Sequence, residues 1–280
     1  MNPGTLGAGM ATYLDDILRA HRGATARDTR DLNHLIKLAS AAENEPARGF
    51  AAAITAAPGL AVVAEIKRAS PSLGAIAPDL DPARLAEAYR DGGAVCLSVL
   101  TDEEFFSGSR SDLVSAREAV DLPVIRKDFT VVPADVCDAR LMGADAILLI
   151  TAALSPTELA SLMDLARQLE IEALVEVHDE AEAELALSLG GGLIGVNQRD
   201  LTTFEVDGGR AERVAAVLPE GVVKVAESGV RSAADAARLR DVGFDAILVG
   251  ESLVRAHDPS AAVRRLVDAG RLESSVGRGD

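Results

Sequence analysis

The chain has 280 residues, of which 48% are hydrophobic and 26% are charged. This composition is typical of a globular protein, and the length suits either two domains or one large α/β barrel. The formal net charge is −16, from 44 acidic and 28 basic residues. Because such a field repels polyanions, it argues against binding of nucleic acid or of an anionic membrane. A small anionic ligand is compatible with it where basic groups gather locally.

Cys96 and Cys137 show no CxxC spacing, and we predict two buried free thiols in a reducing compartment. The first ten residues lack the basic and apolar segments of a signal peptide. No apolar run has the length of a membrane span. We therefore predict a cytoplasmic protein without membrane attachment.

Residues 1–60 are predicted to form an N-terminal helical extension, in which Leu14, Ile17 and Leu18 fall on one helical face. The sequence leaves open whether these helices close the bottom of a barrel or lean over its mouth.

From Ala61 onward, short apolar runs alternate with Ala- and Leu-rich segments at helical spacing. The predicted strands are Ala61–Ile66, Ala94–Val99, Val124–Arg126, Ala146–Ile150, Ala173–Val177, Leu193–Val196, Val222–Ala226 and Ala246–Val249. The predicted helices are Ala83–Asp91, Asp112–Val120, Pro133–Met142, Pro156–Leu169, Glu180–Leu189, Arg210–Val217, Ala233–Asp241 and Ala261–Ala269.

Several of these helices end in glycine just before the next strand, which is typical of repeated αβ units. Eight such units predict a (β/α)8 TIM barrel over residues 61–272, followed by a disordered tail at 273–280. A doubly wound sheet of eight strands is the alternative. The barrel is favoured because no topological break interrupts the series.

Polar side chains stand at the ends of almost all predicted strands, where a (β/α)8 barrel carries its functional groups. Glu65 and Lys67 end the first strand, and Lys127 and Glu176 follow later ones. Taken alone, the Glu65–Lys67 pair is equally well explained as a structural ion pair. The convergence of so many polar groups at one mouth favours a functional site.

The last two units carry glycine loops, Ser228–Gly229 and Gly250–Glu251. Glycine lets backbone N–H groups approach an anion, and barrels of this kind often bind phosphate at these two loops. The alternative is that Gly250 only permits a tight turn. The four histidines (His21, His34, His178 and His257) show no metal-ligand spacing, so we predict no metal.

Six ordered motifs resemble the indole-3-glycerol phosphate synthase family. They are Ala-Glu-Ile-Lys-Arg-Ala-Ser-Pro-Ser, Ser-Val-Leu-Thr-Asp-Glu-Glu-Phe-Phe-Ser-Gly-Ser, Pro-Val-Ile-Arg-Lys-Asp-Phe, Leu-Val-Glu-Val-His, Ile-Gly-Val-Asn-Gln-Arg-Asp-Leu and Val-Ala-Glu-Ser-Gly-Val. The resemblance implies closure of the indole ring of 1-(2-carboxyphenylamino)-1-deoxyribulose 5-phosphate, with loss of CO2 and water. It implies no cofactor, and a phosphorylated small molecule as the only ligand.

The resemblance also implies residue roles. Lys127 would be the general acid, and Lys67 would bind the substrate carboxylate and share the acid role during dehydration. Glu176 would be the general base, Glu65 would orient and polarise the lysines, and Asn197 would hold Glu176. Ser228 belongs with this catalytic set.

The substrate-binding residues that the resemblance implies fall into two groups. The phosphate would bind Arg199 and the two glycine loops. The anthranilate ring would be enclosed by Pro71, Phe106, Phe129, Leu148 and Leu201, with Ser70 in the adjoining loop.

This chain departs from many relatives at Leu73, Gln198 and Ser107–Ser109, which puts loop closure and substrate affinity in doubt. One alternative is a neighbouring phosphate-binding barrel such as phosphoribosylanthranilate isomerase, which usually relies on a cysteine that the first strand here lacks. Another is a catalytically silent homologue, which would be expected to lose Lys127 or Glu176. We expect a monomer or a weak homo-oligomer.

Overall fold

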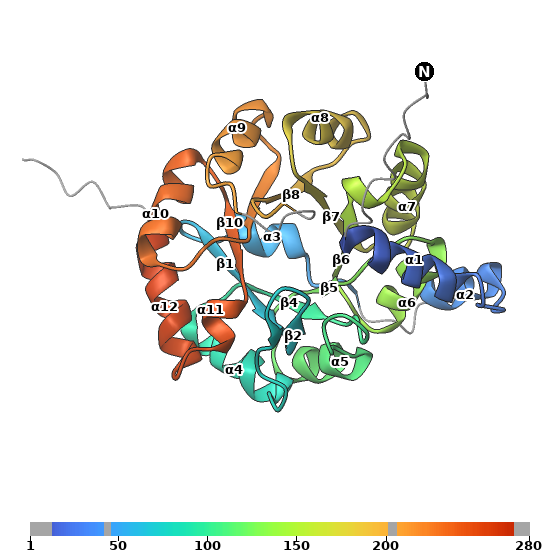
Figure 1. The fold of residues 1–280 in the computed structure, drawn as a ribbon, viewed down its shortest axis with the longest axis horizontal. Helices are drawn as coiled ribbons and strands as arrows, with labels where there is room; N and C mark the ends of the chain where they lie inside the picture. The colour runs from blue at the N-terminus through green and yellow to red at the C-terminus, as the bar shows by residue number, and fades with distance from the viewer. Residues whose placement is uncertain (1–12, 42–45, 201–205, 272–280) are drawn as a thin grey trace, which may run out of the picture.

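The computed structural model describes residues 13–41, 46–200 and 206–271, and within them eight parallel strands close into a barrel. Figure 1 looks down on the strands, which the helices surround. The order around the barrel follows the chain, and β1 closes it by pairing with both β4 and β10. The predicted (β/α)8 barrel is therefore confirmed, and the open doubly wound sheet is excluded. The barrel strands are β1 (Ala61–Ile66), β4 (Cys96–Leu100), β5 (Val124–Lys127), β6 (Ala146–Ile150), β7 (Glu172–Val177), β8 (Leu193–Asn197), β9 (Val223–Glu227) and β10 (Ala246–Val249).

Most of the outer helices begin at capping side chains or prolines, whereas the two that follow Gly209 and Gly250 begin without a side-chain cap. Ser155 caps one helix through a reciprocal capping box with Glu158, and Pro156 occupies its first turn. Gly93 ends another helix with a φ of 97°, a conformation that glycine adopts at low cost. The helices are α4 (Pro82–Gly92), α5 (Arg110–Ala119), α6 (Pro133–Leu141), α7 (Pro156–Gln168), α8 (Glu180–Ser188), α9 (Arg210–Val217), α10 (Ala233–Val242), the short α11 (Glu251–Val254) and α12 (Pro259–Gly270), with a 3-10 turn, η1, at Thr151–Ala153.

The strands are buried on both faces, because side chains fill the barrel and helices cover its outside. Every residue of β1, β4, β6, β8 and β10 is buried. This is why these strands read as continuous apolar runs rather than as alternating patterns. The few charged side chains inside the barrel lie at the strand ends, which makes those ends the place to expect a functional site.

The helices before β1 cover both ends of the barrel. They are α1 (Tyr13–Thr25), α2 (Leu32–Ala39) and α3 (Phe50–Thr55). At the start of α3, Phe50 is fully buried and the Ala51 N–H donates to the carboxylate of Glu172, where β7 begins. α3 therefore closes the bottom of the barrel. Residues of α1 line the cavity at the opposite end. Both placements that the sequence left open occur, the bottom for α3 and the mouth for α1, while α2 packs against α6.

The segment after β1, predicted as a plain loop, contains a small hairpin. The two-residue strands β2 (Ala69–Ser70) and β3 (Gly74–Ala75) pair antiparallel. Arg68 fixes its base, because the guanidinium donates to both oxygens of Asp112 at 2.9 Å. Two-residue strands carry too little hydrophobic alternation to be recognised in a sequence.

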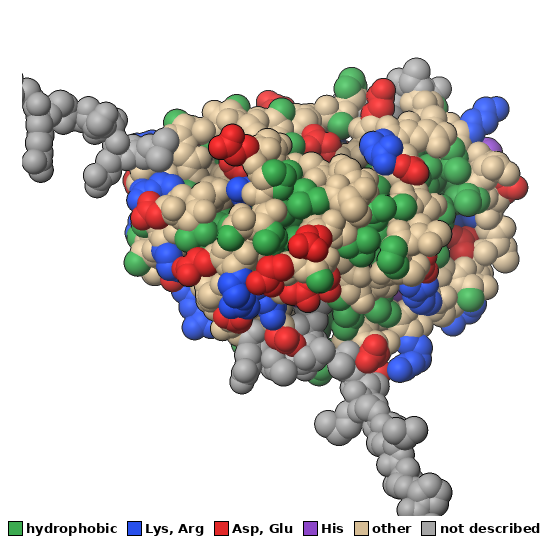
Figure 2. Space-filling model, turned by 90° about the horizontal axis from the view of Figure 1, so that it is seen from above, with side chains coloured by type: hydrophobic (Ala, Val, Ile, Leu, Met, Phe, Trp, Pro, Cys, Tyr) green, Lys and Arg blue, Asp and Glu red, His purple; other side chains and the backbone are tan. Residues whose placement is uncertain are grey.

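Both cysteines are buried free thiols, as predicted, with Cys96 on β4 and Cys137 on α6. None of the described helices is long and apolar enough to cross a membrane. Figure 2 shows acidic, basic and apolar side chains interspersed on the face seen from above.

Candidate active site

A cavity of about 450 Å³ opens at the carboxyl ends of the barrel strands. This volume lies within the range of small-molecule binding sites. Every predicted site residue within the described ranges lines this cavity. Leu201, the remaining one, lies outside those ranges. Those lining it are Glu65, Lys67, Ser70, Pro71, Phe106, Lys127, Phe129, Leu148, Glu176, Asn197, Arg199, Ser228, Gly229, Gly250 and Glu251.

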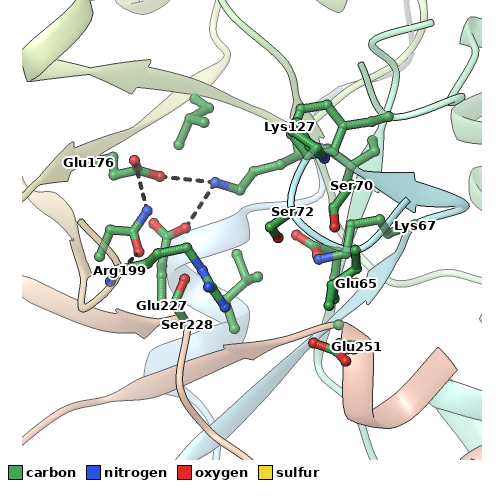
Figure 3. A pocket seen from close by; sticks show the side chains of 18 of the residues that line it. Glu65, Lys67, Ser70, Ser72, Lys127, Glu176, Arg199, Glu227, Ser228 and Glu251 are labelled. Carbon is green, nitrogen blue, oxygen red and sulfur yellow. Dashed lines mark hydrogen bonds and ion pairs between the residues drawn. The ribbon is translucent and has the colours of Figure 1, made fainter. Parts of the chain in front are cut away.

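Lys127, at the end of β5, lies between two buried carboxylates. Its Nζ is 3.0 Å from Glu176 Oε2 and 2.9 Å from Glu227 Oε2 (Figure 3). Burial by itself would lower the pKa of Lys127, but the charges of Glu176, Glu227 and Glu65 outweigh it and raise that pKa. The ammonium is therefore the stable form before substrate arrives.

Glu176, on β7, is a buried acid of the cavity with three polar neighbours. Asn197 Nδ2 donates to Glu176 Oε1 at 3.1 Å, which is the contact that the resemblance implies (Figure 3). Burial would raise the pKa of Glu176, but Lys127, His178 and Asn197 together lower it below its usual range. The resting site thus holds an ionised carboxylate against an ammonium.

Lys67 and Glu65 form a second, separate ion pair, with Nζ and Oε1 2.7 Å apart. Of the two lysines, Glu65 contacts only Lys67. On Lys127 it acts through its charge, which helps to raise the pKa of that lysine. Gly250 packs directly on this pair, because a Cβ there would lie 2.3 Å from Glu65 Oε1. The turn after β10 therefore touches the end of β1.

Apolar side chains form the opposite wall of the cavity. The rings of Phe106 and Phe129 lie 6.3 Å apart between centroids, and Leu148 from β6 lines the same space. Leu14 and Ile17 of α1 add to this wall, and the sequence did not predict their part in it. The wall is suited to a flat aromatic group.

The end of the cavity formed by the last two units carries the predicted glycine loops. Ser228 has a φ of 64°, which residues other than glycine rarely adopt, and Gly229 follows with 79°. Arg231 and Arg255, which the sequence did not single out, also line the cavity. Five basic and five acidic side chains line the cavity, whereas the whole chain has 28 basic and 44 acidic residues. Basic groups are thus concentrated where an anion would bind.

One group of three described side chains has the chemistry of a metal-ligand set. It consists of His21 on α1, with Asp102 and Asp128 from the loops after β4 and β5, and its ligand atoms lie within 4.8 Å of one another. The sequence analysis found no such set because these residues are far apart in the chain. His21 Nε2 is 2.8 Å from Asp102 Oδ2, and both carboxylates accept further hydrogen bonds. The contacts present are those of an ion-pair cluster that ties α1 to the mouth.

The comparisons with known proteins agree with one another. The sequence model of the family described as indole-3-glycerol phosphate synthase matches residues 14–266. The indole-3-glycerol phosphate synthase of Mycobacteroides abscessus is 51% identical over 260 residues, covering 92% of this chain and 95% of its own. That of Mycobacterium ulcerans is 50% identical over 261 residues, covering 93% and 95%. This chain belongs to the indole-3-glycerol phosphate synthase family.

A solved structure outside the indole-3-glycerol phosphate synthase family shares the fold alone. Thiamine phosphate pyrophosphorylase from Pyrococcus furiosus superposes with a TM-score of 0.57 at 16% identity, covering 75% of this chain and 94% of that one.

In this member of the indole-3-glycerol phosphate synthase family, Glu227 is a second carboxylate beside Lys127, which the sequence did not predict. The residue was visible at a strand end, but nothing in the sequence showed that it contacts Lys127. It is buried, its Oε1 has no hydrogen-bond partner, and burial is the main cause that raises its pKa to about 7. Gly195 on β8 leaves room for it, because a Cβ there would lie 2.1 Å from Glu227 Oε1.

Proposed function

We propose that this cavity converts 1-(2-carboxyphenylamino)-1-deoxyribulose 5-phosphate to indole-3-glycerol phosphate, CO2 and water, as the tryptophan-pathway enzyme. The observation that carries the proposal is Lys127, a largely buried ammonium between two carboxylates, in a cavity that also has an apolar lining. The reaction needs an acid at the ribulose carbonyl and a base for the ring proton, within a site from which water is excluded. Lysine and glutamate on two strands of one barrel provide that pair.

The proposed sequence of steps begins with separation of the resting ion pair. When the substrate draws Lys127 away from Glu176, the pKa of each group moves back toward neutral, where proton transfer is efficient. Lys127 protonates the carbonyl oxygen as the carboxylate-bearing carbon of the aromatic ring attacks the carbonyl carbon, and CO2 then leaves from that ring carbon. Loss of water then breaks the C–O bond at the former carbonyl carbon. Lys67 protonates the leaving hydroxyl, and Glu176 accepts a proton from the adjacent CH2 of the newly closed five-membered ring.

The remaining contacts position the substrate. We assign the anthranilate ring to Phe106, Phe129 and Leu148, and its carboxylate to Lys67. The phosphate is assigned to Arg199 and the two glycine loops. Ser70 Oγ is buried without a protein partner and lines the cavity, so it is available to the substrate.

Neither cysteine lines the cavity, which disfavours an isomerase that depends on a catalytic thiol. The buried free thiols suit a reducing compartment, and we propose a cytoplasmic location. We also propose that the phosphorylated substrate is the only ligand, that nucleic acid and membrane are not partners, and that the protein works as a monomer or weak homo-oligomer.

The test uses the absence of tryptophan from the chain, because indole fluorescence then reports product directly. Purified protein is mixed with the substrate in metal-free buffer, beside Lys127→Ala and a control, Lys37→Ala, on exposed α2. We expect a rising signal that Lys127→Ala abolishes and Lys37→Ala keeps. Binding without any signal in the wild type would indicate a silent homologue. Equal rates in the wild type and Lys127→Ala would remove Lys127 from the acid role.

A further inference from the structure

Behind Glu176, outside the cavity lining, an imidazole bridges two carboxylates. His178 directly follows β7, and Glu182 lies in the first turn of α8. His178 Nδ1 is 3.0 Å from Glu182 Oε2, and His178 Nε2 is 3.3 Å from Glu176 Oε1. The ring therefore lies between the acid of the cavity and an acid that does not touch it.

The hydrogen bonds around Glu182 determine which ring nitrogen carries hydrogen. Glu182 Oε2 also accepts the His178 backbone N–H at 2.7 Å and lies 2.5 Å from Thr151 Oγ1. An oxygen surrounded by donors in this way is held as a carboxylate, so His178 Nδ1 is the donor toward it.

His178 Nε2 then faces a second carboxylate oxygen. His178 Nε2 is buried and makes no hydrogen bond in the resting structure, but it lies within ion-pair distance of Glu176 Oε1. An unprotonated Nε2 would set its lone pair against those of that oxygen, whereas a protonated Nε2 is attracted to it. The charged groups near the ring are Glu176 on β7 and Glu182 on α8. Lys127 on β5 contacts Glu176 and also Glu227 on β9. Burial would lower the pKa of His178, but the two carboxylates outweigh it and raise it to about 10.

We propose that His178 is a positioning residue, an imidazolium held by Glu182 that keeps Glu176 ionised and directed into the cavity while Lys127 contacts the substrate. The inference rests on the proposed role of Glu176 as base. Without His178, departure of Lys127 would leave Glu176 a buried anion with only the neutral Asn197 beside it. Burial would then raise the pKa of Glu176, so that it would take up a proton before the ring proton is released.

The proposal separates two pH profiles. The acid limb of kcat reports the substrate complex, and that of kcat/KM reports the free enzyme, in which Lys127 still contacts Glu176. In His178→Gln we expect the acid limb of kcat to move up by about one pH unit, the size a single adjacent charge commonly causes. The limb of kcat/KM is expected to move less. Glu182→Gln is expected to shift kcat in the same direction by a smaller amount.

His34→Gln, an exposed histidine on α2, is the matched control and is expected to leave both profiles unchanged. A His178→Gln variant that loses thermal stability but keeps the wild-type kcat profile would show a merely structural role and overturn the proposal.

A second readout needs neither turnover nor a variant of His178. Nitrogen-15 NMR of the imidazole rings at pH 8 is expected to show His178 with both nitrogens protonated in the wild type, and partly deprotonated in Glu176→Gln. A ring that is neutral at pH 7, or that does not respond to Glu176→Gln, overturns the proposal. Absence of turnover in the wild type would count against the proposed function, and this spectrum would still decide the placement of His178.

Discussion

The two ends of the barrel both bury acid–base contacts, but with opposite balances of donors and acceptors. At the amino end, Asp145 is fully buried, and Arg117 donates to its Oδ2 at 2.5 Å. The backbone N–H groups of Arg48 and Val124 donate to the same carboxylate. At the carboxyl end, Lys127 meets two carboxylates, and one oxygen of Glu227 has no partner.

This difference shows that burial of an ion pair does not by itself identify an active site. At the amino end, both oxygens of Asp145 accept hydrogen bonds from the protein, and the pair lies outside the cavity. Its contribution is therefore to the stability of the fold. The carboxyl-end cluster holds a carboxylate in excess and borders a cavity, so its groups can exchange protons with a ligand. Substitutions at the two ends should therefore separate activity from stability.

The largest effect on activity is expected from Glu176→Gln. The amide fills the same volume but cannot accept the ring proton, so kcat should fall by roughly two to four orders of magnitude. Steady-state indole fluorescence measures the loss, with Glu118→Gln on the exposed face of α5 as control. A kcat within tenfold of the wild type would assign the base to another group.

At the opposite end, Asp145→Asn should act on stability alone. It removes the carboxylate that pairs with the buried Arg117 and accepts the N–H groups of Arg48 and Val124, which is expected to cost about 3–5 kcal/mol of the free energy of unfolding. Urea denaturation measures this cost, and kcat per folded molecule should stay at the wild-type value. Asp241→Asn, in an exposed pair with Arg240, is the control and should change stability by about 1 kcal/mol or less. Loss of kcat in folded Asp145→Asn would break the contrast between the two ends.

The smallest effect is a pH dependence of stability due to Glu227, whose pKa burial raises to about 7 from an ordinary 4.5. The folded protein holds this proton more tightly than the unfolded chain does. The resulting stabilisation is complete below about pH 4.5 and is lost as the pH rises through about 7. Relative to Glu227→Gln, the wild type should therefore lose stability between pH 5 and pH 8 in denaturation experiments. A constant difference between the two would indicate that Glu227 titrates normally.

Much of the fold could be predicted because local signals repeat. A buried apolar run marks every unit and glycine follows several of the helices, so all eight barrel strands were located to within about two residues. The polar site residues were found because parallel strands bring their carboxyl ends to one mouth, whereas the residues assigned to the aromatic ring came from the resemblance to the family. The roles assigned to them remain predictions.

What could not be predicted depends on contacts between distant segments. The sequence shows Glu227 and His178 at strand ends, but not that one meets Lys127 and the other Glu176. It shows amphipathic helices before β1, but not that α3 closes the bottom while α1 lines the mouth. The hairpin after β1 is too short to leave a pattern. Partner choice across the barrel is a property of three-dimensional packing, and single-sequence periodicity does not contain it.

Gly195 has a consequence for how this barrel can change over evolution or by design. The third carboxylate of the site occupies space that any side chain on the neighbouring strand would fill. Positions 195 and 227 are therefore coupled, since an alanine at the first is incompatible with a glutamate at the second in its present rotamer. Gly195→Ala adds one methyl group to β8 and displaces the Glu227 carboxylate. Lys127 would then keep Glu176 as its single counter-ion, with every acidic residue left in the sequence.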